Sequence, residues 1–248
     1  MQHLIIGAGR VGRSIGAYAR SLGCDVGFAT RNDMSNRLEE VRAKAARADA
    51  IAIATPDDAI AKALDLIGKP ARSKMLVHFA GGRLVEGVAC LHPLYSFPPE
   101  PLEAATLARI PFAIDPGGPR MSDFIPGAPN SCFVVAQKDR AAYHAIAVLT
   151  ANFAAHIWNE SAAVFAARFP DAPEDALALL LEGCVERFRE APTRSMTGPV
   201  ARSDRVTVAA NLRALADAPR LEALYRAFLA SAWPAALIDE SDEADGSA

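Results

Sequence analysis

The sequence predicts an α/β protein in which a Rossmann-type, mostly parallel sheet is followed by a second, all-helical domain. From Met1 to about residue 135, short apolar runs alternate with helical segments, which is typical of a parallel sheet covered on both faces. Beyond that point, long amphipathic helices replace the strands. The expected boundaries are 1–138 for the α/β domain, 139–238 for the helical domain, and 239–248 for a disordered acidic tail.

A glycine-rich turn follows the first predicted strand. Residues 4–12 read Leu-Ile-Ile-Gly-Ala-Gly-Arg-Val-Gly, the G-x-G-x-x-G pattern of dinucleotide-binding units. In that pattern the first glycine allows a tight bend, the second leaves space for a pyrophosphate and the third lets the next helix pack on the strand. We therefore expect the cofactor to bind at Gly7, Ala8, Gly9, Arg10, Val11 and Gly12. A glycine turn without a dinucleotide and a site for S-adenosylmethionine are the alternatives.

The end of the second predicted strand, at 25–30, favours NADP(H) as the cofactor. NAD sites usually have an Asp or Glu there to bind the ribose hydroxyls. This chain has Thr30, Arg31 and Asn32, which offer a cation and two hydrogen-bond donors to a 2′-phosphate. In the alternative interpretation Asp33 binds the ribose and Arg31 is an ordinary solvated side chain.

The other elements are predicted from periodicity and from turn and capping residues. Strands are expected at 51–55, 74–79, 88–91, 112–115 and 132–135, and one helix at 37–48. The segment 116–130 is rich in Gly and Pro and is expected to be an irregular linker. Four helices are expected to open at Asp139, at Asp171 with Pro173, at Asp204 and at Pro219, the first of them spanning 140–168.

Composition excludes several function classes. The net charge is −3 and no basic cluster alternates with aromatic residues, so no nucleic-acid partner is expected. No apolar run is long enough to cross a membrane, and the early glycine turn leaves no room for a signal peptide, so a cytoplasmic protein is predicted. The four cysteines and five histidines show no metal-ligand spacing, so reduced thiols and no metal site are expected.

Several phrases together resemble one bacterial family. They are Gly-Ala-Gly-Arg-Val-Gly at the start, Leu91-His92-Pro93-Leu94, Tyr143-His144-Ala145 with Asn152-Phe153, and Thr-Gly-Pro-Val-Ala-Arg-Ser-Asp at 197–204. The chain resembles oxidoreductases in which a Rossmann-like domain precedes a helical domain of unknown function, related to ketopantoate reductase, pyrroline-5-carboxylate reductase and prephenate dehydrogenase. It departs from that family at Ala80-Gly81-Gly82, where Ser-Gly-Ala is usual, and at Tyr95-Ser96, where Gln-Thr is usual.

The resemblance implies further contacts to the cofactor. Thr55, Pro56 and Asp58 follow the third strand and correspond to a segment beside the cofactor ribose in related enzymes. Ala80 belongs to a segment that faces the nicotinamide there. Asp58 is alternatively a cap of the next helix.

The long predicted helix carries the candidate catalytic residues. At 100° per residue, His144, Val148 and Asn152 share one face of that helix. Related reductases use a polar residue on this helix, often a lysine, to bind the substrate carbonyl. His144 is therefore the predicted general acid, and Asn152 the residue that orients the carbonyl. A packed histidine without a catalytic role is the alternative.

Four further residues are candidate substrate contacts: His92, Ser195, Thr197 and Arg202. His92 follows a strand that should end at the ligand-binding edge of the sheet. Arg202, in a hydroxyl-rich loop, suits a bidentate pair with a carboxylate. Alternatively, His92 bonds to the backbone, and Arg202 pairs with Asp204 as a helix cap.

These features predict an NADPH-dependent oxidoreductase that reduces a small carboxylate-bearing ketone or imine, as ketopantoate reductase does. The alternative is a non-catalytic NADP-binding regulatory or scaffold protein. A homodimer is also predicted, because the long helix carries Phe153, Ile157 and Trp158, more apolar surface than one small helical domain can cover.

Overall fold

A computed structural model describes residues 1–237 of the chain, and the predicted acidic tail at 239–248 lies outside them. The chain divides into two compact units, of which the first is Met1–Ala151 and the second starts at Asn152. This division falls later than the predicted boundary at 138/139. The reason is that the long helix begins with Arg140, which is 2% exposed and is buried in the first unit.

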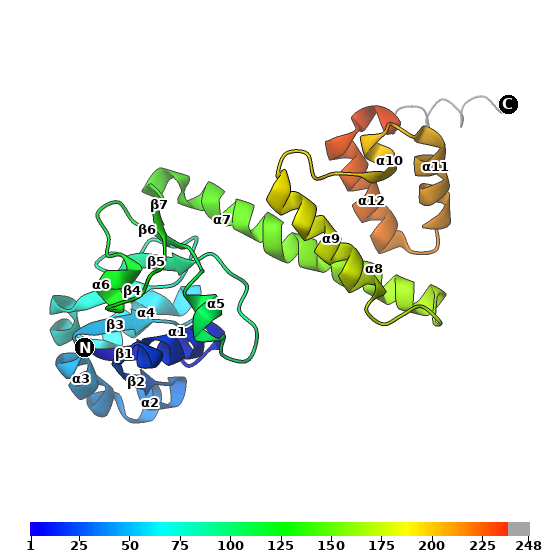
Figure 1. Cartoon of the computed structure of the whole chain (residues 1–248). Coiled ribbons are helices and arrows are strands. Elements are labelled where there is room, and N and C mark those ends of the chain that lie inside the picture. The colour runs from blue at the N-terminus through cyan, green and yellow to red at the C-terminus, as the bar shows by residue number, and fades with distance from the viewer. Residues whose placement is uncertain (238–248) are drawn as a thin grey trace. The chain divides into compact units, whose positions relative to one another are not determined.

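Seven strands form one sheet in the first unit (Figure 1). They are β1 (Gln2–Ile6), β2 (Asp25–Ala29), β3 (Ala50–Ile53), β4 (Met75–His78), β5 (Ala89–Pro93), β6 (Phe112–Ile114) and β7 (Cys132–Val134). Their order is β2-β1-β3-β4-β5-β6-β7, with β1 to β5 parallel and β6 and β7 running the other way. The predicted mostly parallel sheet is confirmed. The order also places a topological switch point between β1 and β3.

Helices pack on both faces of this sheet. The first unit contains α1 (Arg10–Ser21), α2 (Arg31–Asn36), α3 (Leu38–Arg47), α4 (Ile60–Ile67), α5 (Ala104–Leu107), α6 (Met121–Phe124) and α7 (Arg140–Val148), with 3-10 turns η1 (Asp57–Ala59), η2 (Lys69–Ser73) and η3 (Gln137–Asp139). Of these helices, α7 contributes no residue to the two cores that flank the sheet. Alternate strand residues face opposite sides. Ile5 therefore packs in a core with residues of α1, α5 and α6, whereas Leu4 and Ile6 pack in a second core with α3 and α4.

Three expectations for the first unit need correction. The helix α2 was not predicted, because its six residues are too few to show a periodicity. The segment 116–130 is not a linker: it contains α6, whose Met121 and Phe124 are completely buried in the core of this unit. Asp139 precedes α7 as predicted, but its side chain makes no capping hydrogen bond.

The described part of the second unit, residues 152–237, is all-helical, as predicted. Its elements are α8 (Ala154–Arg168), α9 (Ala176–Glu190), α10 (Gly198–Ala201), α11 (Arg205–Ala214), α12 (Pro219–Ala232) and the 3-10 turn η5 (Pro234–Ala236). A π-helical turn, η4 (Leu149–Phe153), connects α7 to α8, so the predicted long helix is continuous but contains one wide turn. The helices predicted to open at Asp204 and Pro219 are confirmed. The prediction for Asp171 and Pro173 was wrong, since α9 starts at Ala176.

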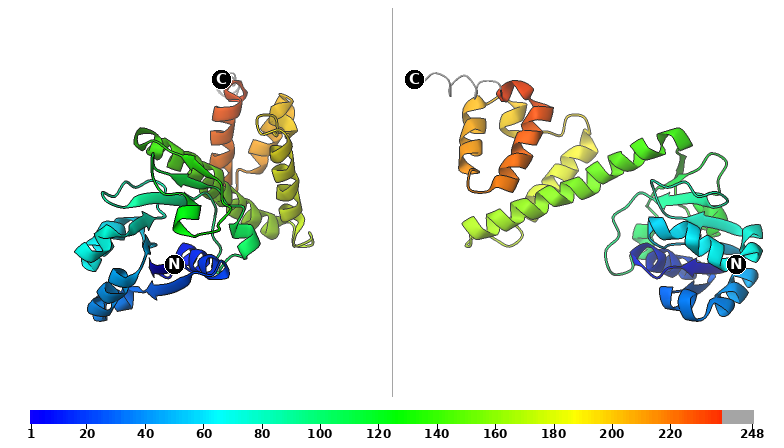
Figure 2. Two further views of the ribbon diagram at one scale, coloured as in Figure 1. Left: turned by 60° about the vertical axis from the view of Figure 1, so that its left-hand side comes forward. Right: turned by 180° about the vertical axis from the view of Figure 1, so that it is seen from behind.

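A small core holds the end of the second unit together. It consists of Val200, Val208, Leu212 and Leu229, contributed by α10, α11 and α12, which group together in every view (Figures 1 and 2). By contrast, α8 and α9 bury no residue completely. Among residues 1–237, no helix combines the length and the apolar character needed to span a membrane.

Candidate active site

A cavity of about 500 Å³ opens at the carboxyl ends of β1, β2 and β3. Its walls include Gly7, Ala8 and Gly9 after β1, Thr30 and Arg31 after β2, and Thr55 and Pro56 after β3. Because β1 pairs with β2 on one side and β3 on the other, the cavity lies at the switch point of the sheet. Open α/β sheets bind their ligands at this position.

The glycine turn has the backbone geometry that the motif requires. Gly7 has a φ of +106°, and a Cβ there would lie 2.5 Å from the carbonyl oxygen of Ala54. A Cβ on Gly12 would lie 2.2 Å from the carbonyl oxygen of Gly7, so α1 packs too closely for any side chain. A Cβ on Gly9 would meet no atom within 4 Å. The backbone at Gly9 is therefore open to a ligand, as a pyrophosphate site needs.

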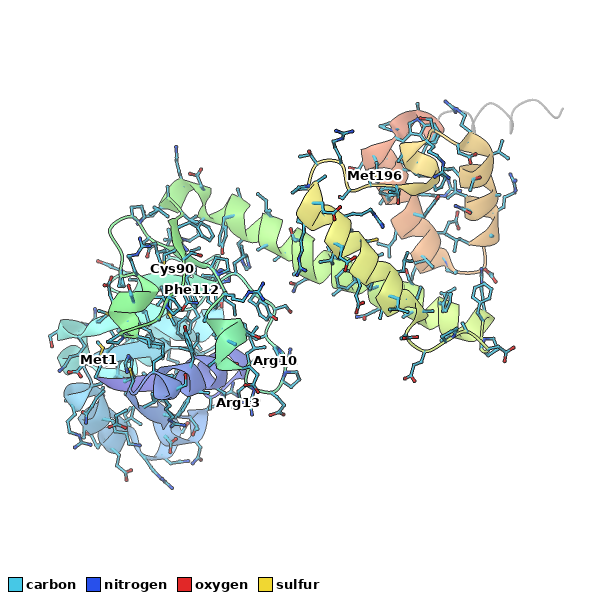
Figure 3. All side chains as sticks on the ribbon, viewed as in Figure 1. Met1, Arg10, Arg13, Cys90, Phe112 and Met196 are labelled. Carbon is cyan, nitrogen blue, oxygen red and sulfur yellow. The ribbon has the colours of Figure 1, made fainter. Side chains whose placement is uncertain are left out.

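The N-terminus of α1 is available to an anion. Gly9 is the N-cap residue, no side chain caps the helix, and its first turn contains no acidic residue. Arg10 and Arg13 lie on this first turn (Figure 3), and the guanidinium of Arg13 donates to the carbonyl oxygen of Pro99. Of the six predicted residues of the turn, Gly7, Ala8 and Gly9 line the cavity, whereas Arg10, Val11 and Gly12 do not.

The predicted roles after β2 are only partly supported. Thr30 and Asp33 form a capping box at the start of α2. The Asp33 carboxylate accepts the Thr30 hydroxyl at 2.6 Å and the Thr30 backbone N–H at 2.9 Å, and these bonds lower the pKa of Asp33. The one hydroxyl proton of Thr30 is thus already donated. The side-chain oxygen of Asn32 accepts a bond from Asn36 at 2.7 Å, and Asn32 does not line the cavity.

Positive charge in the cavity comes from two residues. Arg31 lines it as predicted, and Lys62 of α4 lines it as well. Sequence reasoning missed Lys62, although it is the one basic residue of α4. The rest of this part of the wall is apolar or small and suits a flat base: Met34, Ala59, Ala63 and Leu66.

Two further predicted cofactor contacts lie elsewhere. Asp58 is exposed on η1 and does not line the cavity. The N-cap residue of α4 is Ala59, so Asp58 does not cap this helix either. Ala80 is buried in the loop after β4, where its backbone N–H donates to Nδ1 of His78 at 3.2 Å.

The loop after β4 is the meeting point of two histidines. A Cβ on Gly81 would lie 2.8 Å from Nε2 of His92 and 2.8 Å from Nδ1 of His144. A Cβ on Gly82 would lie 3.0 Å from Cδ2 of His144. Both imidazoles therefore pack directly on glycine backbone. At Gly82, where the family pattern has Ala, a methyl group would press against the His144 ring. His92 comes from β5 and His144 from α7, so the fold joins residues that the sequence separates.

Tyr143 bonds to one of these histidines. Its hydroxyl lies 2.6 Å from Nδ1 of His92, and the two rings meet edge to face. Burial, and then the nearby His144, Arg140 and His78, lower the pKa of His92 to about 4. Burial raises the pKa of Tyr143 to about 12. His92 is therefore bonded to a side chain, not to the backbone, and Nδ1 of His144 is buried without a hydrogen-bond partner among the described residues.

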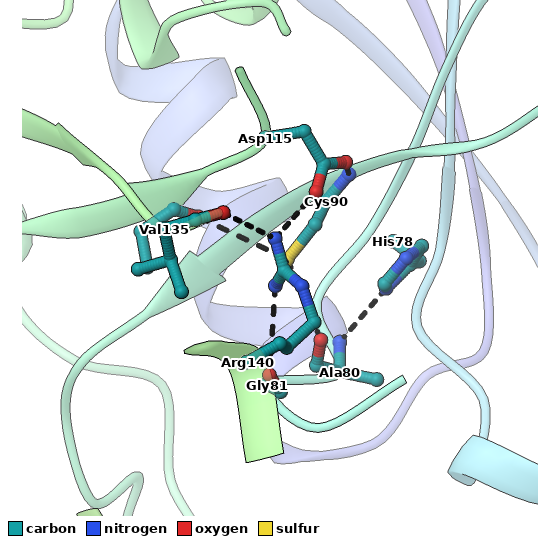
Figure 4. A network of polar contacts seen from close by, with 8 residues as sticks. His78, Ala80, Gly81, Cys90, Asp115, Val135 and Arg140 are labelled. Carbon is teal, nitrogen blue, oxygen red and sulfur yellow. Dashed lines mark hydrogen bonds and ion pairs between the residues drawn. The ribbon is translucent and has the colours of Figure 1, made fainter. Parts of the chain in front are cut away.

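A buried arginine ties this loop to the sheet (Figure 4). Arg140 donates to the Asp115 carboxylate, to Sγ of Cys90 at 2.8 Å and to the carbonyl oxygen of Gly81 at 3.5 Å. Asp115 in turn accepts the Cys90 backbone N–H at 2.7 Å. Burial raises the pKa of the Cys90 thiol. The first residue of α7 thus holds the ends of β5 and β6 and the Gly81 loop in one network.

The nucleotide cavity and the histidine cluster lie along the same edge of the sheet. The cavity lies over β2, β1 and β3, and the histidine cluster follows β4 and β5. Two strand spacings separate β1 from β4, which is about 10 Å. One extended dinucleotide can therefore run from the first group to the second.

The other predicted residues belong to the second unit. Asn152 lies in η4, whose wide turn changes the helical register, so the shared-face argument from His144 does not extend to it. Ser195 and Thr197 precede α10, and exposed Arg202 follows it. Asp204 is a helix cap, because its carboxylate accepts the Thr207 backbone N–H at 3.0 Å and hydroxyl at 2.7 Å.

Comparison with known proteins identifies part of the chain. Residues 119–232 match DUF2520, a domain of unknown function. This DUF2520 segment includes Arg140, Tyr143 and His144, and it confirms the resemblance to Rossmann-like proteins that carry a helical domain of unknown function. No curated protein sequence matches the chain significantly.

Solved structures share the fold along the whole length. A Bacteroides fragilis protein described as a "putative NADP oxidoreductase" is 23% identical, with a TM-score of 0.73 over 93% of this chain and 97% of its own. The Thermotoga maritima protein TM1727 is 21% identical, with a TM-score of 0.66 over 97% and 99%. Pyrroline carboxylate reductase of Plasmodium falciparum, solved with NADP bound, is 12% identical, with a TM-score of 0.56 over 95% and 97%. Identities of 12% to 23% establish a common fold, so this chain has the same fold as these three proteins.

Proposed function

We propose that this protein is an NADPH-dependent oxidoreductase that reduces a small ketone or imine bearing a carboxylate. The observation that carries the proposal is the cavity at the β1–β3 switch point, which combines open backbone at Gly9 with the cations Arg31 and Lys62. A dinucleotide with a 2′-phosphate matches that combination. The shared fold with a reductase that was solved with NADP bound adds support.

The cofactor would be held by distinct parts of the cavity. The amide groups at the start of α1 and the open backbone of Gly9 suit the pyrophosphate, and Arg31 and Lys62 suit the 2′-phosphate. Asp33 does not line the cavity, and its Oδ2 accepts two bonds from Thr30, so the acidic group that an NAD site uses faces elsewhere. When bound, the cofactor supplies the hydride for the reduction.

The proton is assigned to the histidine cluster. His144 is the proposed general acid, since its ring packs on the Gly81 loop at the edge of the sheet that binds ligands. Asn152 is proposed to orient the substrate carbonyl. Ser195, Thr197 and Arg202 are proposed to bind the substrate carboxylate, with the exposed Arg202 guanidinium as the charged partner.

The experiment is a binding and turnover assay. Calorimetry with NADPH and NADH should show tighter binding of NADPH, and absorbance should report NADPH oxidation with one member of a panel of 2-keto acids and cyclic imines. His144→Gln should then lower kcat by about 10²-fold, whereas Arg202→Ala should mainly raise KM. Binding without oxidation across the panel would favour the non-catalytic alternative, and absence of NADPH binding would reject both.

We also propose that the protein is a homodimer. Large apolar side chains stay exposed along the long helix and α9: Ile146 (64%), Leu149 (58%), Phe153 (45%), Trp158 (42%), Leu180 (60%) and Phe188 (53%). Leu180 and Phe188 lie about two turns apart on one face of α9, and exposed apolar side chains arranged in this way are typical of protein–protein interfaces. A second copy of the chain would cover them.

A further inference from the structure

Tyr143 is held between two rings in the first unit. Its ring meets that of Phe133 at a centroid distance of 5.9 Å and that of His92 at 5.6 Å, both nearly edge to face. Phe133 belongs to β7 and His92 to β5. The Tyr143 hydroxyl, 2.6 Å from Nδ1 of His92, is thus placed by packing on both sides.

The surroundings of His92 keep its ring neutral. Burial contributes most to lowering its pKa, and the nearby His144, Arg140 and His78 act in the same direction. Three further titratable groups lie near His92. They are Cys90 of the same strand, the Tyr143 hydroxyl, and the Asp115 carboxylate, which is paired with Arg140. A neutral imidazole carries one N–H and one lone pair, so the partner of Nδ1 determines which nitrogen holds the proton.

The available donors and acceptors determine the direction of the hydrogen bond between Tyr143 and His92. The Tyr143 hydroxyl keeps its proton, and among the described residues its hydrogen-bond partner is Nδ1 of His92. If Nδ1 were the donor, the hydroxyl proton would have no acceptor in this part of the chain. If the hydroxyl donates, its proton and the lone pair of Nδ1 are both used, and the ring proton is on Nε2.

We propose that Tyr143 is a positioning residue that holds His92 as the neutral tautomer with its proton on Nε2, facing the Gly81-Gly82 loop. The proposal rests on the proposed reductase site. A neutral imidazole whose lone pair is already bonded can donate a hydrogen bond to a substrate oxygen but does not act as the acid. This leaves His144, whose Nδ1 faces the same glycine, as the member of the pair that transfers a proton.

The direct test is nitrogen-15 NMR of the five histidine side chains in the cofactor-free protein, with the His92 signal assigned through His92→Gln. In the unmodified protein between pH 6 and pH 8, His92 should show a protonated Nε2 and an unprotonated Nδ1. In Tyr143→Phe, which keeps both ring contacts, the two tautomers should mix. Tyr18→Phe is the matched control, because it also removes one hydroxyl bond, from Tyr18 to Asn130 at 3.1 Å, away from His92.

Two results would overturn the proposal: a protonated Nδ1 in the unmodified protein, or a His92 spectrum that Tyr143→Phe leaves unchanged. Both are measured without cofactor or substrate, so they are independent of whether NADPH binds. Once turnover is observed, Tyr143→Phe should also lower kcat about tenfold with unchanged NADPH affinity, as expected for loss of one oriented hydrogen bond. An unchanged kcat would reject the positioning role even if the tautomer is as expected.

Discussion

Gly81 and His144 are in direct contact, since a Cβ on Gly81 would lie 2.8 Å from Nδ1 of the histidine. The same Cβ would lie 2.8 Å from Nε2 of His92, so both imidazoles of the candidate site pack against Gly81. Any larger residue at this position has to displace one of the two rings.

We therefore expect Gly81→Ala to destabilise the first unit by about 1–3 kcal/mol, the usual cost of overpacking. Urea unfolding measures this loss as a lower midpoint with an unchanged slope. Gly27→Ala is the control, because a Cβ there would meet only the carbonyl oxygen of His3, at 3.8 Å. Equal midpoints for the two variants would contradict the contact.

The cations of the cavity should determine cofactor preference. Calorimetry with 2′,5′-ADP and with ADP measures the contribution of the 2′-phosphate without the nicotinamide. Arg31→Ala should weaken binding of 2′,5′-ADP by about 10- to 100-fold and leave that of ADP unchanged, because a charged hydrogen bond is lost. Lys62→Ala should act in the same direction.

Exposed Lys138 offers the control for these charge changes, since it lies outside the cavity. Lys138→Ala should bind both nucleotides normally. If Arg31→Ala weakens ADP and 2′,5′-ADP equally, Arg31 does not recognise the 2′-phosphate.

The pair of Arg140 and Asp115 should be important for stability. Arg140 is 2% exposed, and Arg140→Ala would leave the Asp115 carboxylate without its cationic partner. We expect a loss of about 3–5 kcal/mol, the usual effect of removing one member of a buried pair. Arg72→Ala breaks the exposed pair with Asp65 in the same unit and should cost less than about 1 kcal/mol. Similar urea midpoints for the two variants would show that the Arg140 network adds little.

Stability should fall in mild acid because of His92. The pKa of this residue is about 4 in the folded protein, against 6.5 for an ordinary histidine. Between these values the unfolded chain binds a proton that the folded chain does not, so stability decreases as the pH falls from about 6.5 to about 4, by up to about 3 kcal/mol. His78, whose pKa burial also lowers, adds to the effect.

Urea midpoints at pH 7.5 and pH 5 check this dependence. His92→Gln should reduce the difference between the two midpoints, whereas His156→Gln, on an exposed position of α8, should not. The attribution to His92 is wrong if both variants keep the full difference.

The apolar surface of the helices should be covered by a second copy of the chain. Light scattering at micromolar concentration should give twice the mass of one chain. The double variant Leu180→Asp with Phe188→Asp should give a monomer, because it places charge on the exposed face of α9. Val206→Asp, at an exposed residue of a different helix, α11, should remain dimeric. A monomeric unmodified protein would rule out the dimer.

Local patterns in the sequence predicted where the strands lie along the chain, the helices that begin at Asp204 and Pro219, and the glycine turn. These features depend on neighbouring residues: strand alternation, capping, the bend at Gly7, and the close approach of α1 at Gly12 that leaves no space for a side chain. Even there, short elements such as α2 were missed, because six residues carry too little periodicity.

Only the tertiary structure decided which side chains meet at the candidate site. The Asp33 carboxylate accepts a bond from Thr30, and Lys62 of α4 lines the same cavity as Arg31 of α2. Tyr143 contacts His92, although 51 positions separate them in the sequence. The wide turn η4 likewise separates Asn152 from the helical register of His144. Such contacts depend on how strands and helices pack together, and sequence spacing contains no measure of that packing.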